Sequence, residues 1–105
     1  MISVYKCTYT TGLGKVSYEW NTRKAKDNVR KHGVEFADAA IALEDEWAIT
    51  ITDPDSNGEQ RFISLGTDPV GRLLVTVFTS RDNNVRPISS RKATKAERKR
   101  YKAMT

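Results

Sequence analysis

The chain has 105 residues, and its 18 Lys and Arg residues against 13 Asp and Glu residues leave a formal net charge of +5 at pH 7. This length fits one domain, residues 1–105, around a single hydrophobic core. The lone cysteine, Cys7, excludes an intrachain disulfide and a cysteine metal cluster, and no apolar run approaches the ~18 residues that a membrane span requires. We therefore expect a cytoplasmic protein that does not associate with membranes.

The N-terminal third predicts a weak strand followed by two helices. Residues 2–9 are rich in Val, Tyr and Thr, which favours an edge strand, and residues 10–15 contain two glycines, which favours a loop. We treat residues 1–17 as an extension to which the pattern assigns no role. From Asn21, a suitable N-cap, helical spacing runs to His32, and Gly33 provides a stop. Residues 35–43 repeat the helical pattern, so the two segments predict a helical hairpin.

The second half of the chain predicts four strands and a last helix. Residues 47–52, 60–65, 72–79 and 85–90 are rich in Val, Ile, Thr and Phe and are separated by turn sequences. Short links between consecutive strands indicate an antiparallel meander, with residues 72–79 as a central strand under the helical hairpin. Thr94 and Glu97 have the spacing of a capping box, so a helix should cover residues 95–103. The fold class is α+β, and we expect Trp20 and Trp47 in the core.

Positive charge is concentrated at the C-terminal end. Residues 84–105 hold eight Lys and Arg residues and a single Glu, whereas residues 34–68 hold nine acids and one base. Such density is unfavourable by self-repulsion unless a polyanion or an acidic partner relieves it, so RNA or DNA is the first candidate ligand. The side chains expected to contact a nucleic-acid backbone are Arg81, Lys92, Lys95 and Arg98.

A set of residues in this chain matches the needs of RNA cleavage without a metal. That reaction requires a base for the 2′-hydroxyl proton, an acid for the leaving 5′-oxygen, and cations around the phosphorus. Arginine suits the last role because its planar fork pairs with phosphate and keeps its charge. We therefore predict that Arg86 and Arg91 clamp the phosphate with help from Arg61, and that strand ends bring these side chains together. The proton acceptor would be His32 or Glu59, with Tyr101 as a donor.

Each of these candidates also has a structural interpretation. His32 follows Ala25 and Val29 on one helix stripe, so it could be a half-buried residue that caps carbonyl groups. Glu59 and Arg61 share a strand face and could form a simple ion pair. Tyr101, four residues after Glu97, could dock the last helix on the sheet.

The chain also resembles the BrnT toxins of bacterial type II toxin-antitoxin systems. The resemblance covers residues 18–101 and rests on five motifs in a fixed order: Tyr18-Glu19-Trp20-Asn21, Asn28-x-x-Lys31-His32-Gly33-Val34-x-Phe36-x-x-Ala39, Glu59-x-Arg61, Gly71-Arg72-Leu73-Leu74-Val75, and Arg86-x-Ile88-Ser89-x-Arg91-x-Ala93-Thr94-x-x-Glu97-Arg98-x-x-Tyr101.

This resemblance implies a RelE-like fold and a metal-independent endoribonuclease that needs no cofactor and halts translation. It implies a BrnA-type antitoxin, expected to be a ribbon-helix-helix protein, that masks the toxin and represses the shared operon. Oligomers would then form only through the antitoxin. The residues at the family's polar positions are His32, Glu59, Arg61, Arg86, Arg91 and Tyr101.

Two alternatives to an enzyme remain at this point. The basic segment alone would equally suit a non-catalytic module that binds RNA or DNA, or an inactive toxin homologue that only binds an acidic protein. Pro87 also departs from the family pattern, in which an aliphatic residue is usual. Because proline removes a ladder donor, we expect the strand to lie at a sheet edge or to bulge there.

Overall fold

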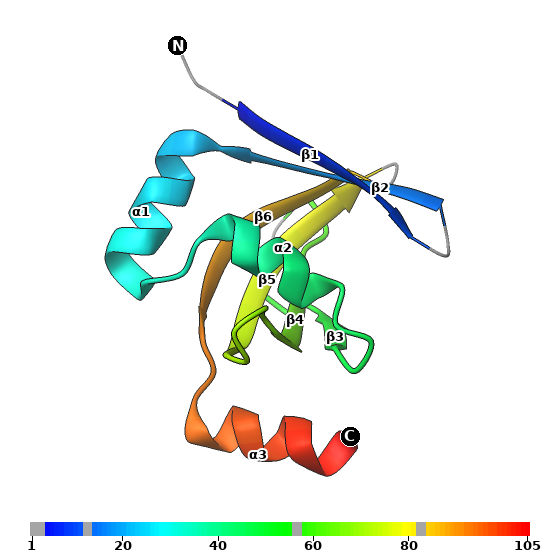
Figure 1. Ribbon diagram of the computed structural model, residues 1–105, viewed down its shortest axis with the longest axis vertical. Helices are drawn as coiled ribbons and strands as arrows, with labels where there is room; N and C mark the ends of the chain where they lie inside the picture. Colours follow the sequence, from blue (N-terminus) through cyan, green and yellow to red (C-terminus); the bar gives the residue numbers. More distant parts are fainter. Residues whose placement is uncertain (1–3, 12–13, 56–57, 82–83) are drawn as a thin grey trace.

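The computed structural model describes the backbone of residues 4–11, 14–55, 58–81 and 84–105, and the side chains of residues 16–55, 58–80 and 84–105 (Figure 1). Its helices are α1 (Thr22–His32), α2 (Phe36–Leu43) and α3 (Lys95–Met104). The strands, in chain order, are β1 (Val4–Thr11), β2 (Gly14–Asn21), β3 (Ile49–Thr52), β4 (Phe62–Thr67), β5 (Leu73–Arg81) and β6 (Asn84–Lys92). The predicted α+β class is confirmed.

The described strands form one mixed sheet in the order β1-β2-β6-β5-β4-β3. The strands β3 to β6 make the antiparallel meander that the sequence predicts. The prediction of a four-stranded, purely antiparallel sheet is nevertheless wrong, because β1 and β2 extend it and β2 pairs with β6 in parallel. Most of the N-terminal extension is therefore part of the sheet, and β1 is an edge strand. The loop predicted for residues 10–15 is too long, since β1 reaches Thr11 and β2 begins at Gly14, and residues 12–13 lie outside the described residues.

Both ends of α1 lie where the sequence indicates. The Asn21 side chain accepts hydrogen bonds from the backbone N–H groups of Arg23 and Lys24, at 2.8 and 3.2 Å. Gly33 ends the helix in the left-handed region, with φ of 68°, and donates its N–H to Val29. These contacts satisfy backbone groups that a helix end leaves without partners.

The helices α1 and α2 cover one face of the sheet (Figure 1). Two clusters of buried side chains form this layer of the core: Tyr18, Trp20, Phe36 and Ala40 in one, and Val34, Ala42 and Leu74 in the other. Close approach of α2 to β4 depends on Gly66, where a Cβ atom would lie 2.3 Å from the carbonyl oxygen of Ala42. Each helix packs chiefly on the strands, so the pair forms a cover over the sheet.

Asn28 fastens α1 to β6 inside the core. Its amide group donates to the carbonyl groups of Val34 and Ser90, at 2.9 and 2.8 Å, and its oxygen accepts the Ser90 N–H at 3.0 Å. Asn28 is only 5% exposed, so these bonds are shielded from water. The first helix therefore has a fixed position on the last strand.

The strand β6 bulges next to Pro87, as the missing proline N–H predicts. Ser89 pairs with Val77 but Pro87 pairs with Phe78, so Ile88 is an extra residue on β6. Parallel pairing with β2 ends at Val85, which leaves Pro87 beyond that ladder. The proline is thus accommodated in an interior strand without loss of a ladder bond to β2.

The C-terminal helix α3 lies beyond the end of β6, and Tyr101 helps to dock it on the sheet. Its N-terminus carries the predicted capping box between Thr94 and Glu97. The hydroxyl of Tyr101 donates to Asp45 at 2.5 Å and lies 3.0 Å from the hydroxyl of Thr67. The docking interpretation of Tyr101 therefore agrees with its contacts.

Trp20 lies in the core as predicted, but the prediction for Trp47 is wrong. Trp47 is 58% exposed and lies in the turn before β3. Among the described residues, no helix is both long enough and apolar enough to cross a bilayer.

Candidate active site

A buried carboxylate and an arginine meet where the parallel pair β2 and β6 begins. Ser17 pairs with Asn84 and Tyr18 with Val85, which puts Glu19 beside Arg86. Glu19 accepts hydrogen bonds from the Asn84 amide and from Nη2 of Arg86, both at 2.7 Å. Glu19 is 9% exposed, whereas the Arg86 side chain is 62% exposed. One edge of the guanidinium is therefore anchored in the protein while the rest faces solvent.

These residues line a polar cavity of about 320 Å³ together with Glu59 and Thr79. Two residues predicted from sequence, Arg86 and Glu59, thus come together in one cavity. In such a pair the guanidinium can donate hydrogen bonds to a phosphate oxygen, and a carboxylate can accept a proton from a nearby hydroxyl. The sequence analysis missed Glu19, Asn84 and Thr79 as cavity residues, although Glu19 belongs to the Tyr18-Glu19-Trp20 motif that it singled out.

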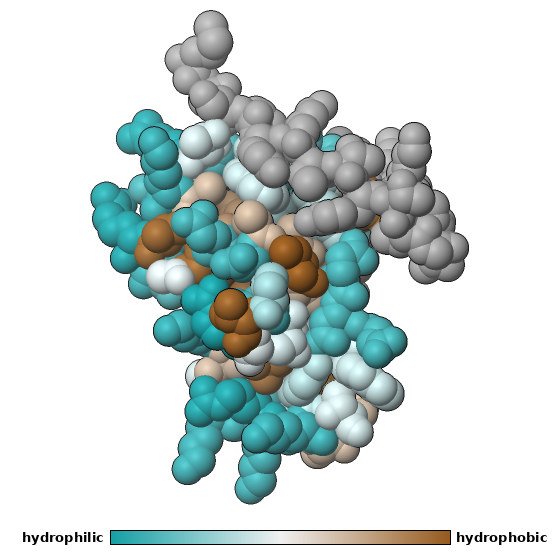
Figure 2. Space-filling view, in the orientation of Figure 1, coloured by the Kyte–Doolittle hydropathy of each residue, from teal (hydrophilic) through white to brown (hydrophobic). Residues whose placement is uncertain are grey.

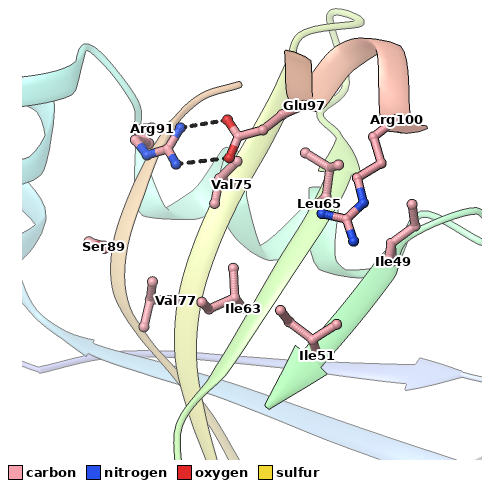
Figure 3. A pocket seen from close by; sticks show the side chains of 10 residues that line it. All are labelled: Ile49, Ile51, Ile63, Leu65, Val75, Val77, Ser89, Arg91, Glu97 and Arg100. Carbon is pink, nitrogen blue, oxygen red and sulfur yellow. Dashed lines mark hydrogen bonds and ion pairs between the residues drawn. The ribbon is translucent and has the colours of Figure 1, made fainter. Parts of the chain in front are cut away.

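Arg91 lies further along β6 in a bidentate ion pair. Its two terminal nitrogens donate to the Glu97 carboxylate at 2.8 and 3.0 Å (Figure 3). These bonds lower the pKa of Glu97 from 4.5 to about 2 and raise the pKa of Arg91. Glu97 also accepts the Thr94 N–H at 2.8 Å, so the same carboxylate caps α3 and holds Arg91.

The bulge on β6 determines which way these two arginines point. Arg86 pairs with Thr79 and Arg91 with Val75, two β5 residues of the same alternating set. A regular strand would put positions 86 and 91 on opposite faces, because they differ by five residues. The extra residue, Ile88, shifts the alternation of side chains by one position. Both arginine side chains therefore lie on the face of the sheet opposite α1 and α2.

The two arginines nevertheless do not share a cavity. Within the described part of the chain, Arg86 lines the polar cavity and Arg91 lines a second, largely apolar one. Their β5 partners are four residues apart, which corresponds to about 13 Å along a strand. The expectation that Arg86, Arg91 and Arg61 meet at a single spot is therefore not met by the geometry.

Arg61 is engaged in the turn that follows β3. Its Nε lies 3.5 Å from the Asp53 carboxylate, and its Nη2 donates to the carbonyl oxygen of Asp55 at 3.1 Å. Arg61 also accepts the Asp53 N–H with its own carbonyl oxygen at 2.8 Å. The residue lines neither cavity, and its contacts join Asp53 and Asp55 to the start of β4.

His32 is the last residue of α1 and is exposed, so the prediction of a half-buried histidine is wrong. It lies at the end of a helix that covers the other face of the sheet, and it lines neither of the two cavities. Of the two candidate bases, the structure therefore places Glu59, and not His32, beside Arg86.

Burial and hydrogen bonding around Tyr101 support a structural role for this residue. Burial and, next, the hydrogen bond to Asp45 raise its pKa. For Asp45, burial opposes ionisation, but the bonds from Tyr101 and from the Trp47 and Thr67 backbone outweigh it and the pKa is lowered. The pair therefore stays a neutral phenol bound to a carboxylate at neutral pH.

The remaining basic candidates are surface residues. Lys92, Lys95 and Arg98 are exposed, and Arg98 also donates to the Ala93 carbonyl at 3.2 Å. The side chain of Arg81 lies outside the described residues. In Figure 2, hydrophilic side chains predominate at the outer side of α1 and at α3. In the described part of the chain, no three His, Cys, Asp or Glu residues are grouped as metal ligands.

The architecture resembles that of a solved structure. Three helices and a mixed sheet in this arrangement match the crystal structure of the Brucella abortus ribonuclease toxin BrnT. The match has a TM-score of 0.54 and 23% sequence identity, and it covers 72% of this chain and 94% of that one, so the two share a fold.

The family assignment comes from the sequence. Residues 20–97 match the family model described as "Ribonuclease toxin, BrnT, of type II toxin-antitoxin system". The chain therefore belongs to the BrnT family of ribonuclease toxins, and the resemblance inferred from its motifs is confirmed. No curated protein matches this chain.

Proposed function

We propose that this chain is an endoribonuclease toxin that cleaves RNA without a metal ion, inhibits translation and acts in the cytoplasm. The observation that carries the proposal is the polar cavity in which Arg86, Glu19 and Glu59 meet. Family membership supplies the substrate class, and the cavity offers a cation and a carboxylate at one place. Membership of a type II system also implies a cognate antitoxin, which we expect to be a BrnA-like ribbon-helix-helix protein.

In this proposal Arg86 binds the scissile phosphate and stabilises the charge that develops on it. Glu19 orients the guanidinium by accepting from one terminal nitrogen, at 2.7 Å. Because the side chain is already held in place, it needs little reorganisation when the phosphate becomes more negative. Preorganised donors accelerate a reaction in this way. Arg91, about 13 Å further along the sheet, would contact a neighbouring part of the RNA after exchanging its Glu97 partner.

Glu59 is the proposed proton acceptor for the 2′-hydroxyl group, which attacks the phosphorus as the bond to the 5′-oxygen breaks, and the leaving 5′-oxygen takes its proton from water. It lines the same cavity as Arg86, whereas His32 lies outside it. Loss of a general base lowers the rate by about 10² to 10⁴ and leaves substrate binding largely intact. Glu59→Gln should therefore cleave slowly but retain RNA affinity, and His32→Ala should cleave like the wild type.

The decisive experiment incubates the purified protein with a long RNA in the presence of a chelator. Wild-type protein should produce fragments, and Arg86→Ala should lower the rate by about 10²-fold or more. Arg30→Ala is the matched control, because Arg30 is a highly exposed arginine on α1 that forms a surface ion pair with Asp27.

Three results would count against the proposal. Equal cleavage by wild type and Arg86→Ala would remove Arg86 from the site. Cleavage that stops with chelator and returns with added metal would contradict a metal-independent reaction. RNA that shifts on a gel and stays intact would favour the non-catalytic binding module.

A further inference from the structure

The face of the sheet opposite α1 and α2 carries an apolar groove, and of the residues that line it only Arg91 enters the proposal for RNA binding. Its floor consists of two rows of side chains that run across four strands (Figure 3). The register pairs define the rows: Ile49, Leu65, Val75 and Arg91 in the first, and Ile51, Ile63, Val77 and Ser89 in the second. In Figure 3, α2 lies behind the sheet and these side chains project from the other side.

Only part of this groove is covered. The first row packs under α3, where Tyr101 and Ala93 join Leu65 and Val75 in a cluster. The second row is covered only in part, because Ile63 packs against this cluster whereas Ile51 at its end is 52% exposed. The cavity between the rows and α3 measures about 290 Å³. Exposed apolar side chains gathered in one hollow can serve as an interaction site.

The chemistry of the groove favours a protein over RNA. Single-stranded RNA binds through base stacking on aromatic rings, and none of the ten residues that line the groove is aromatic. Branched aliphatic side chains instead pack against the apolar side of a partner element. The rim adds charge selectivity, because Arg91 and Arg100 stand there with Glu97 as the single acid.

We propose that this groove is the docking site for an acidic amphipathic helix of the cognate antitoxin, lying across the strands next to α3. The inference rests on the proposed function in that it takes the partner from the toxin-antitoxin system. Apolar side chains of the helix cover the second row, and its acidic residues face Arg100 and Arg91.

The dimensions suit a helix of about three turns. Neighbouring strands lie ~4.8 Å apart, so the path from β3 to β6 is about 14 Å. At 1.5 Å per residue, about ten helical residues span it. The ten residues of α3 already run across the strand direction at this end of the sheet (Figure 1). The antitoxin helix would extend that layer over the second row.

Two isoleucines of similar exposure on opposite faces allow a matched test. Ile51, 52% exposed, lies in the groove, and Ile41, 41% exposed, lies on α2. The probe is the purified protein encoded by the gene adjacent to that of this chain, titrated by calorimetry against the full-length protein. Ile51→Glu should raise Kd about 10-fold or more, and Ile41→Glu should leave it nearly unchanged.

RNA cleavage is measured on the same variants to keep the two proposals apart. Wild-type cleavage by Ile51→Glu, combined with weakened binding of the probe, supports the groove as a docking site. Equal Kd values for the two variants, or no binding of the probe to the wild type, overturn the docking site without bearing on cleavage. Loss of RNA affinity in Ile51→Glu with intact probe binding would assign the groove to RNA and also overturn it.

Methyl NMR on the wild type removes any dependence on how the variants fold. On addition of the probe, the methyl signals of Ile51 and Ile63 should shift, and that of Ile41 should stay in place. Charge reversal at the rim gives a further check: Arg100→Glu should weaken binding more than Lys102→Glu, because Lys102 on α3 does not line the groove. The opposite order, or a shift at Ile41 alone, would contradict the proposal.

Discussion

The ion pair between Glu97 and Arg91 makes the stability of the fold depend on pH. Replacing Glu97 by Gln removes the charge but keeps a residue that can complete the capping box with Thr94. The substitution therefore isolates the ion pair from the helix cap. Its effect on the free energy of unfolding can be worked out from the pKa of Glu97.

The pKa of Glu97 falls from 4.5 to about 2, mainly through the hydrogen bonds from Arg91. At 1.36 kcal/mol per pKa unit, this corresponds to about 3 kcal/mol of stability. The Glu97 and Arg91 side chains are 31% and 42% exposed, so solvent screening reduces the contribution to about 1 to 2 kcal/mol.

The sign follows from the direction of the shift. Because the folded pKa is depressed, the contribution is complete above the unfolded value of 4.5 and is lost as the pH falls toward about 2. Urea unfolding followed by tryptophan fluorescence between pH 6 and pH 2 measures it. Glu97→Gln should be about 1 to 2 kcal/mol less stable than wild type at pH 6 and should converge with it at low pH.

A matched control is Glu46→Gln, which removes an exposed carboxylate outside this pair. Its stability difference from wild type should stay small across the range. If the difference in the free energy of unfolding between Glu97→Gln and wild type stays the same from pH 6 to pH 2, the assignment of this contribution to the ion pair is refuted.

Three further substitutions test packing and docking. Gly66→Ala should destabilise the fold by about 1 to 3 kcal/mol in urea unfolding, because the new Cβ atom meets the backbone oxygen of Ala42; unchanged stability would mean that α2 can move away. Asn28→Ala leaves buried backbone groups of Val34 and Ser90 without partners and should cost about 2 to 4 kcal/mol, and a loss below 1 kcal/mol would contradict its role as a core fastener. Tyr101→Phe should lower stability by about 1 to 2 kcal/mol and slow RNA cleavage far less than the about 10²-fold expected for a lost general acid; a 10²-fold loss would restore Tyr101 as a proton donor.

Local signals in the sequence were sufficient for most elements of the fold. Asn21, Gly33 and the pair Thr94 and Glu97 define helix ends through contacts within a few residues, and these ends were predicted correctly. Apolar runs separated by turns likewise identified β3 to β6. The bulge at Pro87 could be predicted because proline lacks a backbone donor whatever its surroundings.

Long-range pairing accounts for what sequence reasoning missed. The strand β2 owes its place to a parallel partner that lies far away in the chain, and neither strand carries a local sign of that pairing. The contact of Glu19 with Arg86 depends on this pairing and could not be predicted for the same reason. The pairing of Tyr101 with Asp45, separated by 56 positions, could be anticipated only as docking of α3 on the sheet.

The contact between Glu19 and Arg86 can form only late in translation. The two residues are 67 positions apart, and the cavity needs β2, near the start of the chain, to pair with β6, near its end. Translation delivers the N-terminal segments first, so a partly made chain holds Glu19 without its arginine. If the cavity cleaves RNA as proposed, a growing polypeptide is harmless to the ribosome that makes it until its final strand emerges. A message truncated before the codon for Arg86 would then yield no toxic product.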